Sequence, residues 1–127
     1  MKKILIVDDD AEFVDATRAV LEKNGYNVVS ANNGKHGLEK AKQEKPDMLL
    51  LDMMMDYDSE GFDLVQTLSA TDETKQIPIV VLTGIRKAAS LPFEQAKNAY
   101  TLNIRQILEK PVKPDVLIDA VKKALQQ

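Results

Sequence analysis

Short runs of apolar residues recur along the chain, and four of them stop at a polar or charged side chain. Each run has the length of a β-strand and is apolar throughout, which is typical of strands buried on both faces of a sheet. A fifth, valine-rich segment at 26–31 predicts another strand. The four runs and the residues that end them are 4–7 with Asp8, 48–51 with Asp52, 79–82 with Thr83, and 107–108 with Glu109 and Lys110.

Segments with apolar residues at helical spacing separate these runs. The first predicted helix follows Asp10, which has the chemistry of an N-cap, and Asn24-Gly25 would end it. The second ends before Pro46, and the last begins near Pro114. The fourth would have Pro92 in its first turn, with Ser90 as its cap. The side chains expected to face inward on the five helices, in chain order, are Phe13, Ala16, Val20 and Leu21; Gly37, Leu38 and Ala41; Phe62, Leu64, Val65 and Leu68; Phe93, Ala96 and Tyr100; and Leu117, Ala120, Val121, Ala124 and Leu125.

Five strands that alternate with five helices predict an α/β fold. Parallel strands need crossovers of this length, so we expect a doubly wound, five-stranded parallel sheet covered by helices on both faces. Residues 1–127 would form a single domain. Right-handed crossovers place the carboxyl ends of all strands at one edge of the sheet, and ligands of such sheets bind at that edge.

Composition excludes several classes of function. The 127 residues are 44% hydrophobic and 29% charged, as in an ordinary globular domain. The net charge of −3 and the lack of a basic stripe argue against direct nucleic-acid binding. The chain has no cysteine, which excludes disulfides and thiolate metal sites and fits a reducing compartment. The apolar run after the first lysines is too short for a signal peptide or membrane insertion, so a cytoplasmic protein is expected.

The polar residues at the strand ends point to a phosphoryl-transfer site. The common edge would bring together Asp8, Asp9, Asp52, Thr83 and Lys110. Several carboxylates cannot all ionise at close range unless a cation neutralises them. Oxygen ligands without histidine or cysteine favour a hard cation, which predicts Mg²⁺, with Mn²⁺ as the alternative. A carboxylate beside such a metal, a lysine and a hydroxyl has what phosphoryl transfer requires, and an aspartate can itself be the nucleophile.

At these residues the chain resembles the receiver domains of two-component response regulators, including the chemotaxis-type single-domain members. The motifs that match are the Asp8-Asp9 pair, the stretch 46–52 that ends at Asp52, the Thr83-Gly84 pair and Lys110-Pro111. They occur in this order at four successive strand ends, and the resemblance extends over residues 3–125. It implies the flavodoxin-like fold of receivers.

The resemblance also implies a role for each acidic residue. Asp52 would accept a phosphoryl group from a phosphohistidine on a sensor histidine kinase or a phosphotransfer protein. Asp9 and Asp52 would bind Mg²⁺ directly, Asp8 would act through a coordinated water, and Met54 would contribute its backbone carbonyl.

Thr83 and Lys110 would contact the phosphoryl group once it is in place. Because both contacts exist only in the modified protein, they would give modification a differential energy between two conformations. The implied partners are an unknown downstream target protein and, as an open possibility, a second copy in a phosphorylation-dependent dimer. Such a protein is not an enzyme in the usual sense, since it catalyses only its own phosphorylation and slow dephosphorylation.

Four departures from the family pattern concern the loops and the switch. Asp56 stands where a proline is common, and Gly61 comes one residue later than usual. The segment between Thr83 and Lys110 is several residues longer than in short members, which predicts an enlarged fourth helix or leading loop. Ile107 occupies the usual aromatic switch position, so the familiar coupling of threonine movement to an aromatic rotamer cannot operate in that form.

Two apolar residues predict a long-lived phosphorylated state. In the family, the side chains two residues after the acceptor and two after the threonine influence the attack of water on the acyl phosphate. Here these are Met54 and Ile85, which cannot orient a water by hydrogen bonding. We expect slow loss of the phosphoryl group after the donor is removed. A half-life of seconds without any phosphatase would contradict this.

Two other functions compete with the signalling receiver. A degenerate receiver would serve only as a protein-docking module. Ile107 and the unusual loops argue for this function, and the presence of all five site residues argues against it. A phosphohydrolase of the haloacid dehalogenase type also uses an aspartate nucleophile, Mg²⁺, a hydroxyl and a lysine. Its nucleophile follows the first strand in an Asp-x-Asp-x-Thr/Val pattern, whereas Glu12 stands at the Thr/Val position here, and 127 residues leave no room for a cap domain.

Overall fold

The computed structural model describes residues 1–52, 60–83 and 104–126 and shows a five-stranded parallel sheet in the order β2-β1-β3-β4-β5. The predicted α/β fold is therefore confirmed. The predicted fourth helix falls within residues 84–103 and lies outside the described residues. The elements are β1 (Lys3–Val7), α1 (Ala11–Lys23), β2 (Asn27–Ala31), α2 (Gly34–Glu44), β3 (Met48–Asp52), α3 (Glu60–Ala70), β4 (Ile79–Thr83), β5 (Ile104–Glu109) and α5 (Pro114–Leu125).

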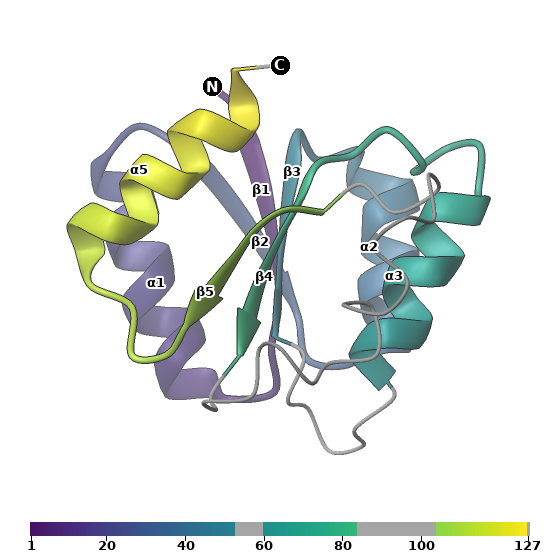
Figure 1. The fold of residues 1–127 in the computed structure, drawn as a ribbon, viewed down its shortest axis with the longest axis horizontal. Coiled ribbons are helices and arrows are strands. Elements are labelled where there is room, and N and C mark those ends of the chain that lie inside the picture. Colours follow the sequence, from purple (N-terminus) through teal and green to yellow (C-terminus); the bar gives the residue numbers. More distant parts are fainter. Residues whose placement is uncertain (53–59, 84–103, 127) are drawn as a thin grey trace.

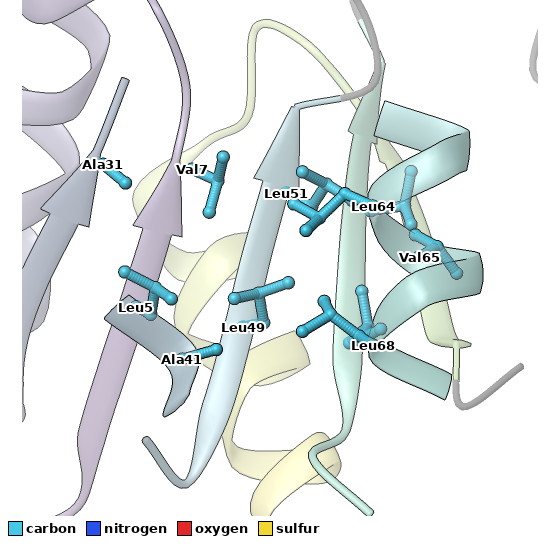
Figure 2. Close-up of a cluster of buried hydrophobic side chains, with 11 residues drawn as sticks. Leu5, Val7, Ala31, Ala41, Leu49, Leu51, Leu64, Val65 and Leu68 are labelled. Carbon is cyan, nitrogen blue, oxygen red and sulfur yellow. The ribbon is translucent and has the colours of Figure 1, made fainter. Parts of the chain in front are cut away.

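The sheet is covered on both faces, and each face has its own hydrophobic core. Helices α1 and α5 lie on one side of the sheet and α2 and α3 on the other (Figure 1). Alternate residues of β1 enter the two cores: Leu5 and Val7 pack toward α2 and α3, and Ile4 and Ile6 toward α1 and α5. Figure 2 shows the first of these cores, where Leu64 of α3 lies beside Leu51. Burial on both faces explains why the strands are apolar throughout rather than alternating.

The ends of α1 form as the sequence predicts, but its buried face is shifted. The side chain of Asp10 accepts hydrogen bonds from the backbone N–H groups of Glu12 and Phe13, at 3.1 and 3.2 Å. The buried positions of α1 are Val14, Thr17 and Leu21, whereas Ala16, expected to face inward, is exposed. The apolar pattern was misleading because a threonine occupies a core position and the small Ala16 covers little apolar surface.

Glycine at position 37 lets α2 approach β1 directly below the functional edge of the sheet. A Cβ atom at Gly37 would lie 2.9 and 3.2 Å from the two Cγ atoms of Val7 and 3.3 Å from a Cδ of Leu64. The first of these distances is shorter than real Cβ contacts allow, so a larger residue would push the helix away from the strand. Val7 immediately precedes Asp8, so this contact also supports the end of β1.

We expect Gly37→Ala to destabilise the protein. Overpacking costs about 1–3 kcal/mol and exceeds the helix-propensity gain of about 1 kcal/mol that alanine brings. Urea unfolding should therefore show a lower midpoint with an unchanged slope. Lys42→Ala, at an exposed position of the same helix, is the matched control and should change stability by less than about 0.5 kcal/mol. Equal or greater stability of Gly37→Ala would contradict the close approach.

Strand β2 forms one edge of the sheet, and a side chain of α1 reaches over it. The guanidinium of Arg18 donates one hydrogen bond to the carbonyl oxygen of Val28, at 2.9 Å, and one to Oγ of Ser30, at 3.0 Å. The backbone groups of Asn27 and Ala31 form hydrogen bonds toward β1. Because successive residues of a strand alternate in direction, the carbonyl of Val28 faces away from β1, toward the open side of the sheet.

Within the described segments, no helix has the length and apolar character needed to cross a membrane.

Candidate functional site

The strand register places the predicted site residues at one edge of the sheet. Asp8 follows β1 directly, and Asp52 is the last residue of β3. Leu51 pairs with Val7, and Asp52 pairs with Leu82 of β4, which precedes Thr83. The backbone of Thr83 pairs with Glu109, and Lys110 follows. The predicted meeting of these strand ends is confirmed, although the side chain of Thr83 lies outside the described part of the structure.

Three carboxylates converge at this edge. One oxygen from each of Asp8, Asp9 and Asp52 lies within 4.8 Å of the others. The Asp8 and Asp52 residues are buried, with 2% and 3% of their surface exposed, and Asp9 is exposed. A cluster of carboxylate oxygens, partly buried and open on one side, has the donor set that a hard divalent cation prefers. The residues present therefore fit Mg²⁺ or Mn²⁺.

Both carboxylate oxygens of Asp8 already have partners in the protein. Oδ1 accepts a hydrogen bond from the backbone N–H of Asp10, at 2.9 Å, and Oδ2 accepts one from the ammonium of Lys110, at 2.8 Å. A cation that bound one of these oxygens directly would compete with the hydrogen bond at that oxygen. The three consecutive aspartates thus have different environments: Asp8 is buried and hydrogen-bonded, Asp9 is exposed, and Asp10 caps α1.

Lys110 is the cation that the described structure places among these carboxylates. Its Nζ lies 2.8 Å from Asp8 and 3.4 Å from Asp52, and 19% of its side chain is exposed. Burial alone would lower the pKa of Lys110, but the hydrogen bond that its ammonium donates to Asp8 and the charge of Asp52 outweigh burial and raise the pKa above its usual value. The ammonium is therefore charged at neutral pH and offsets part of the negative charge of the cluster.

The structure adds one residue that the sequence did not assign to the site. The ring of Phe13 lies under the Lys110 ammonium, with 4.0 Å between Nζ and the ring centroid. From helical spacing, Phe13 was expected to serve only the core face of α1. A helical pattern carries no information about a contact with a residue near the far end of the chain, so only the three-dimensional arrangement reveals it.

A groove of about 440 Å³ adjoins the carboxylates, between α1, α2 and the end of β2. Asp8 and Asp9 line one part of it, and Arg18, Ser30, His36 and Lys40 are among the residues that line the rest. Asp52 is not among the lining residues, so the groove reaches the cluster at Asp8 and Asp9. His36 is exposed.

Several predicted features fall on residues that are not described. Met54 and Ile85 lie in the segments 53–59 and 84–103, so neither the backbone ligand nor the two apolar neighbours of the acceptor can be placed. The same holds for Asp56 and the enlarged loop before β5. Ile107, at the switch position, is half-buried and packs against the core on the side of the sheet that α2 and α3 cover.

A doubly wound sheet with an acidic, lysine-containing site at its carboxyl edge defines the receiver class of α/β proteins. The chain belongs to the response regulator receiver domain family, whose model matches residues 4–122. Receiver domains act in two-component signalling, so the predicted family and signalling role are confirmed, and the haloacid dehalogenase alternative is not supported.

The chain matches one curated relative over nearly its full length and another over only part of it. The chain is 34% identical to PilH of Pseudomonas aeruginosa over 98% of both proteins. It is 41% identical to the transcriptional regulatory protein CpxR of Escherichia coli over 66% of this chain, which corresponds to 34% of CpxR. The chain thus spans nearly all of PilH and about one third of CpxR.

Solved structures share the whole fold. A putative response regulator from Chloroflexus aurantiacus superposes with a TM-score of 0.84 at 30% identity, covering 99% of this chain and 98% of that one. The chemotaxis response regulator CheY4 of Vibrio cholerae gives a TM-score of 0.82 at 26% identity, covering 98% and 99%.

Proposed function

We propose that this receiver accepts a phosphoryl group on Asp52 in a reaction that needs Mg²⁺. The observation that carries the proposal is the convergence of Asp8, Asp9 and Asp52 within 4.8 Å, with the Lys110 ammonium 3.4 Å from Asp52. This arrangement pairs a buried carboxylate nucleophile with a fixed positive charge. Membership in the receiver family supports the same role.

The phosphoryl donor would be a phosphohistidine on a sensor histidine kinase or phosphotransfer protein. A carboxylate oxygen of Asp52 attacks phosphorus, the P–N bond breaks, and the histidine nitrogen keeps the electron pair and takes a proton. The product is an acyl phosphate on Asp52. Lys110 is placed to pair with the new phosphoryl oxygens, and Thr83 would contribute its hydroxyl from the adjacent strand end.

The metal would be held by Asp9 and Asp52 directly and by Asp8 through water. The two hydrogen bonds that already occupy Asp8 support this division. When bound, a divalent cation neutralises the carboxylates and draws negative charge from the phosphoryl oxygens. We keep the backbone carbonyl of Met54 as a further ligand, and Mn²⁺ as the alternative ion.

Modification would alter the surface that a downstream target protein or a second copy of the chain recognises. In this proposal residues 1–127 act as one receiver domain in the cytoplasm. The protein would catalyse only its own phosphorylation and slow dephosphorylation, and no other substrate.

Labelling with a small-molecule phosphodonor tests this function. Incubation with acetyl phosphate and Mg²⁺ should add one phosphoryl group to the intact protein, and a chelator should prevent it. Sizing of the labelled and unlabelled protein in the same experiment reports on dimerisation. If titration shows that Mg²⁺ binds but no phosphoryl group is incorporated, the acceptor role is wrong and the docking-module alternative takes its place.

A further inference from the structure

The aromatic ring next to Lys110 has no evident role in the hydrophobic core. Phe13 is half-buried in the first turn of α1, yet among the described residues it belongs to neither core cluster nor to the partly buried side chains packed around them. Its backbone N–H is fixed by the Asp10 cap, at 3.2 Å. The cap fixes the backbone at Phe13, and the 4.0 Å contact with Lys110 places the ring beside the site.

The geometry between the ring and the ammonium is that of a cation–π contact. The distance of 4.0 Å from Nζ to the ring centroid lies well inside the range of about 6 Å over which an ammonium is attracted to an aromatic face. Two carboxylates, Asp8 and Asp52, accept hydrogen bonds from the same nitrogen. Because only 19% of the Lys110 side chain is exposed, solvent screens the attraction to the ring less than it would at the surface.

The ring contact differs from the carboxylate contacts in one respect that matters for function. A cation bound among the aspartates would attract the Asp8 carboxylate through the bridging water and would weaken its 2.8 Å contact with Lys110. The attraction of the ring does not depend on how the carboxylates are oriented. It would therefore keep the ammonium beside Asp52 while the carboxylates rearrange around the metal and the phosphoryl group.

We propose that Phe13 is a positioning residue for Lys110, which it holds within reach of the phosphoryl group on Asp52. The inference rests on the proposed function, because it assigns the ring a role in that reaction. Phe13 itself touches no reacting atom.

Graded fluorination of the Phe13 ring separates its electrostatics from its size. Phenylalanine with one, two or three ring fluorines keeps nearly the same shape but has a progressively weaker negative face. With acetyl phosphate and Mg²⁺, we expect the rate of Asp52 labelling to fall steadily along the series, by about two- to fivefold in total. A small donor is used because a protein donor would add its own contacts with α1.

Two substitutions with standard amino acids and a control position elsewhere in the chain complete the experiment. Phe13→Leu should lose rate by a similar factor and should abolish the ring-current shift of the Lys110 side-chain protons in NMR spectra, whereas Phe13→Tyr should keep both. The control is the same fluorinated series at Tyr26, a half-buried aromatic residue that directly precedes β2, at the amino ends of the strands. Labelling rates at that position should not change.

The possible failures can be told apart. If the wild type incorporates no phosphoryl group, the proposed function is wrong, and the role of the ring is overturned with it. If the wild type is labelled but the fluorinated series at Phe13 is flat, only the positioning role is overturned. A folded Phe13→Leu protein that is labelled at the wild-type rate would likewise overturn the positioning role alone.

Discussion

An Asp52→Asn protein is expected to incorporate no phosphoryl group under conditions that label the wild type. The amide of asparagine is a poor nucleophile and cannot form an acyl phosphate. The substitution also removes one of the three carboxylates that converge within 4.8 Å, so the affinity for Mg²⁺ should fall. Intact-protein mass spectrometry measures the incorporation, and the wild-type label should be released by hydroxylamine, as expected for an acyl phosphate.

The matched control for this variant is Asp47→Asn, at the other end of the same strand. Asp47 is exposed, and its carboxylate accepts a hydrogen bond from the backbone N–H of Lys3, at 2.8 Å, which an asparagine oxygen can also accept. Labelling of this control should equal that of the wild type. Persistent labelling of Asp52→Asn would show that another residue is the acceptor and would contradict the proposed function.

Lys110→Met should make the protein less stable without metal and should increase its affinity for metal. Methionine fills a similar volume but leaves the buried carboxylates of Asp8 and Asp52 without the ammonium that lies 2.8 and 3.4 Å away. Removing one partner of a fully buried ion pair costs about 3–5 kcal/mol. Since 19% of the lysine side chain is exposed, solvent screening should reduce this to about 1–3 kcal/mol.

The same charge removal should favour the metal. Without the competing ammonium, we expect Mg²⁺ to bind about tenfold more tightly. Mg²⁺ should therefore restore more stability to the variant than it adds to the wild type. Urea unfolding in chelator and in Mg²⁺, together with metal titration, tests both parts.

Lys123→Met serves as the comparison for the lysine variant. Lys123 forms an exposed ion pair with Asp119 on α5, which is worth less than about 1 kcal/mol. Its replacement should leave metal affinity unchanged. If Lys110→Met bound Mg²⁺ no more tightly than the wild type, Lys110 would not compete with the metal for the carboxylates.

The sequence predicts the parts of this molecule that depend on local pattern and on strand direction. Apolar runs such as 48–51 identify strands buried on both faces, and parallel strands must bring their carboxyl ends to one edge. Strand direction therefore brings Lys110 to Asp8, although the two are 102 positions apart in the sequence. The prediction succeeds because the chemistry sits at the strand ends, where topology fixes position.

Contacts that depend on the packing of one particular side chain could not be predicted in this way. The burial of Thr17 is not signalled by its residue type, and the exposed Ala16 fitted the apolar pattern as well as a buried residue would. The ring of Phe13, in the first turn of α1, contacts Lys110, the residue after β5. The helical spacing of apolar residues does not predict a contact between these two segments. Geometry of this kind follows from the packing of helices against the sheet, which the sequence pattern leaves undetermined.

The hydrogen bonds of Arg18 have a consequence for how this protein meets other copies of itself. An edge strand with free backbone groups can template a strand from a second molecule, and such pairing leads to domain swapping or aggregation. At β2 the guanidinium already occupies the outward-facing carbonyl of Val28. This hydrogen bond hinders strand pairing at that position of β2. Any dimer that forms on phosphorylation is accordingly expected to use a side-chain surface rather than an extension of the sheet through β2.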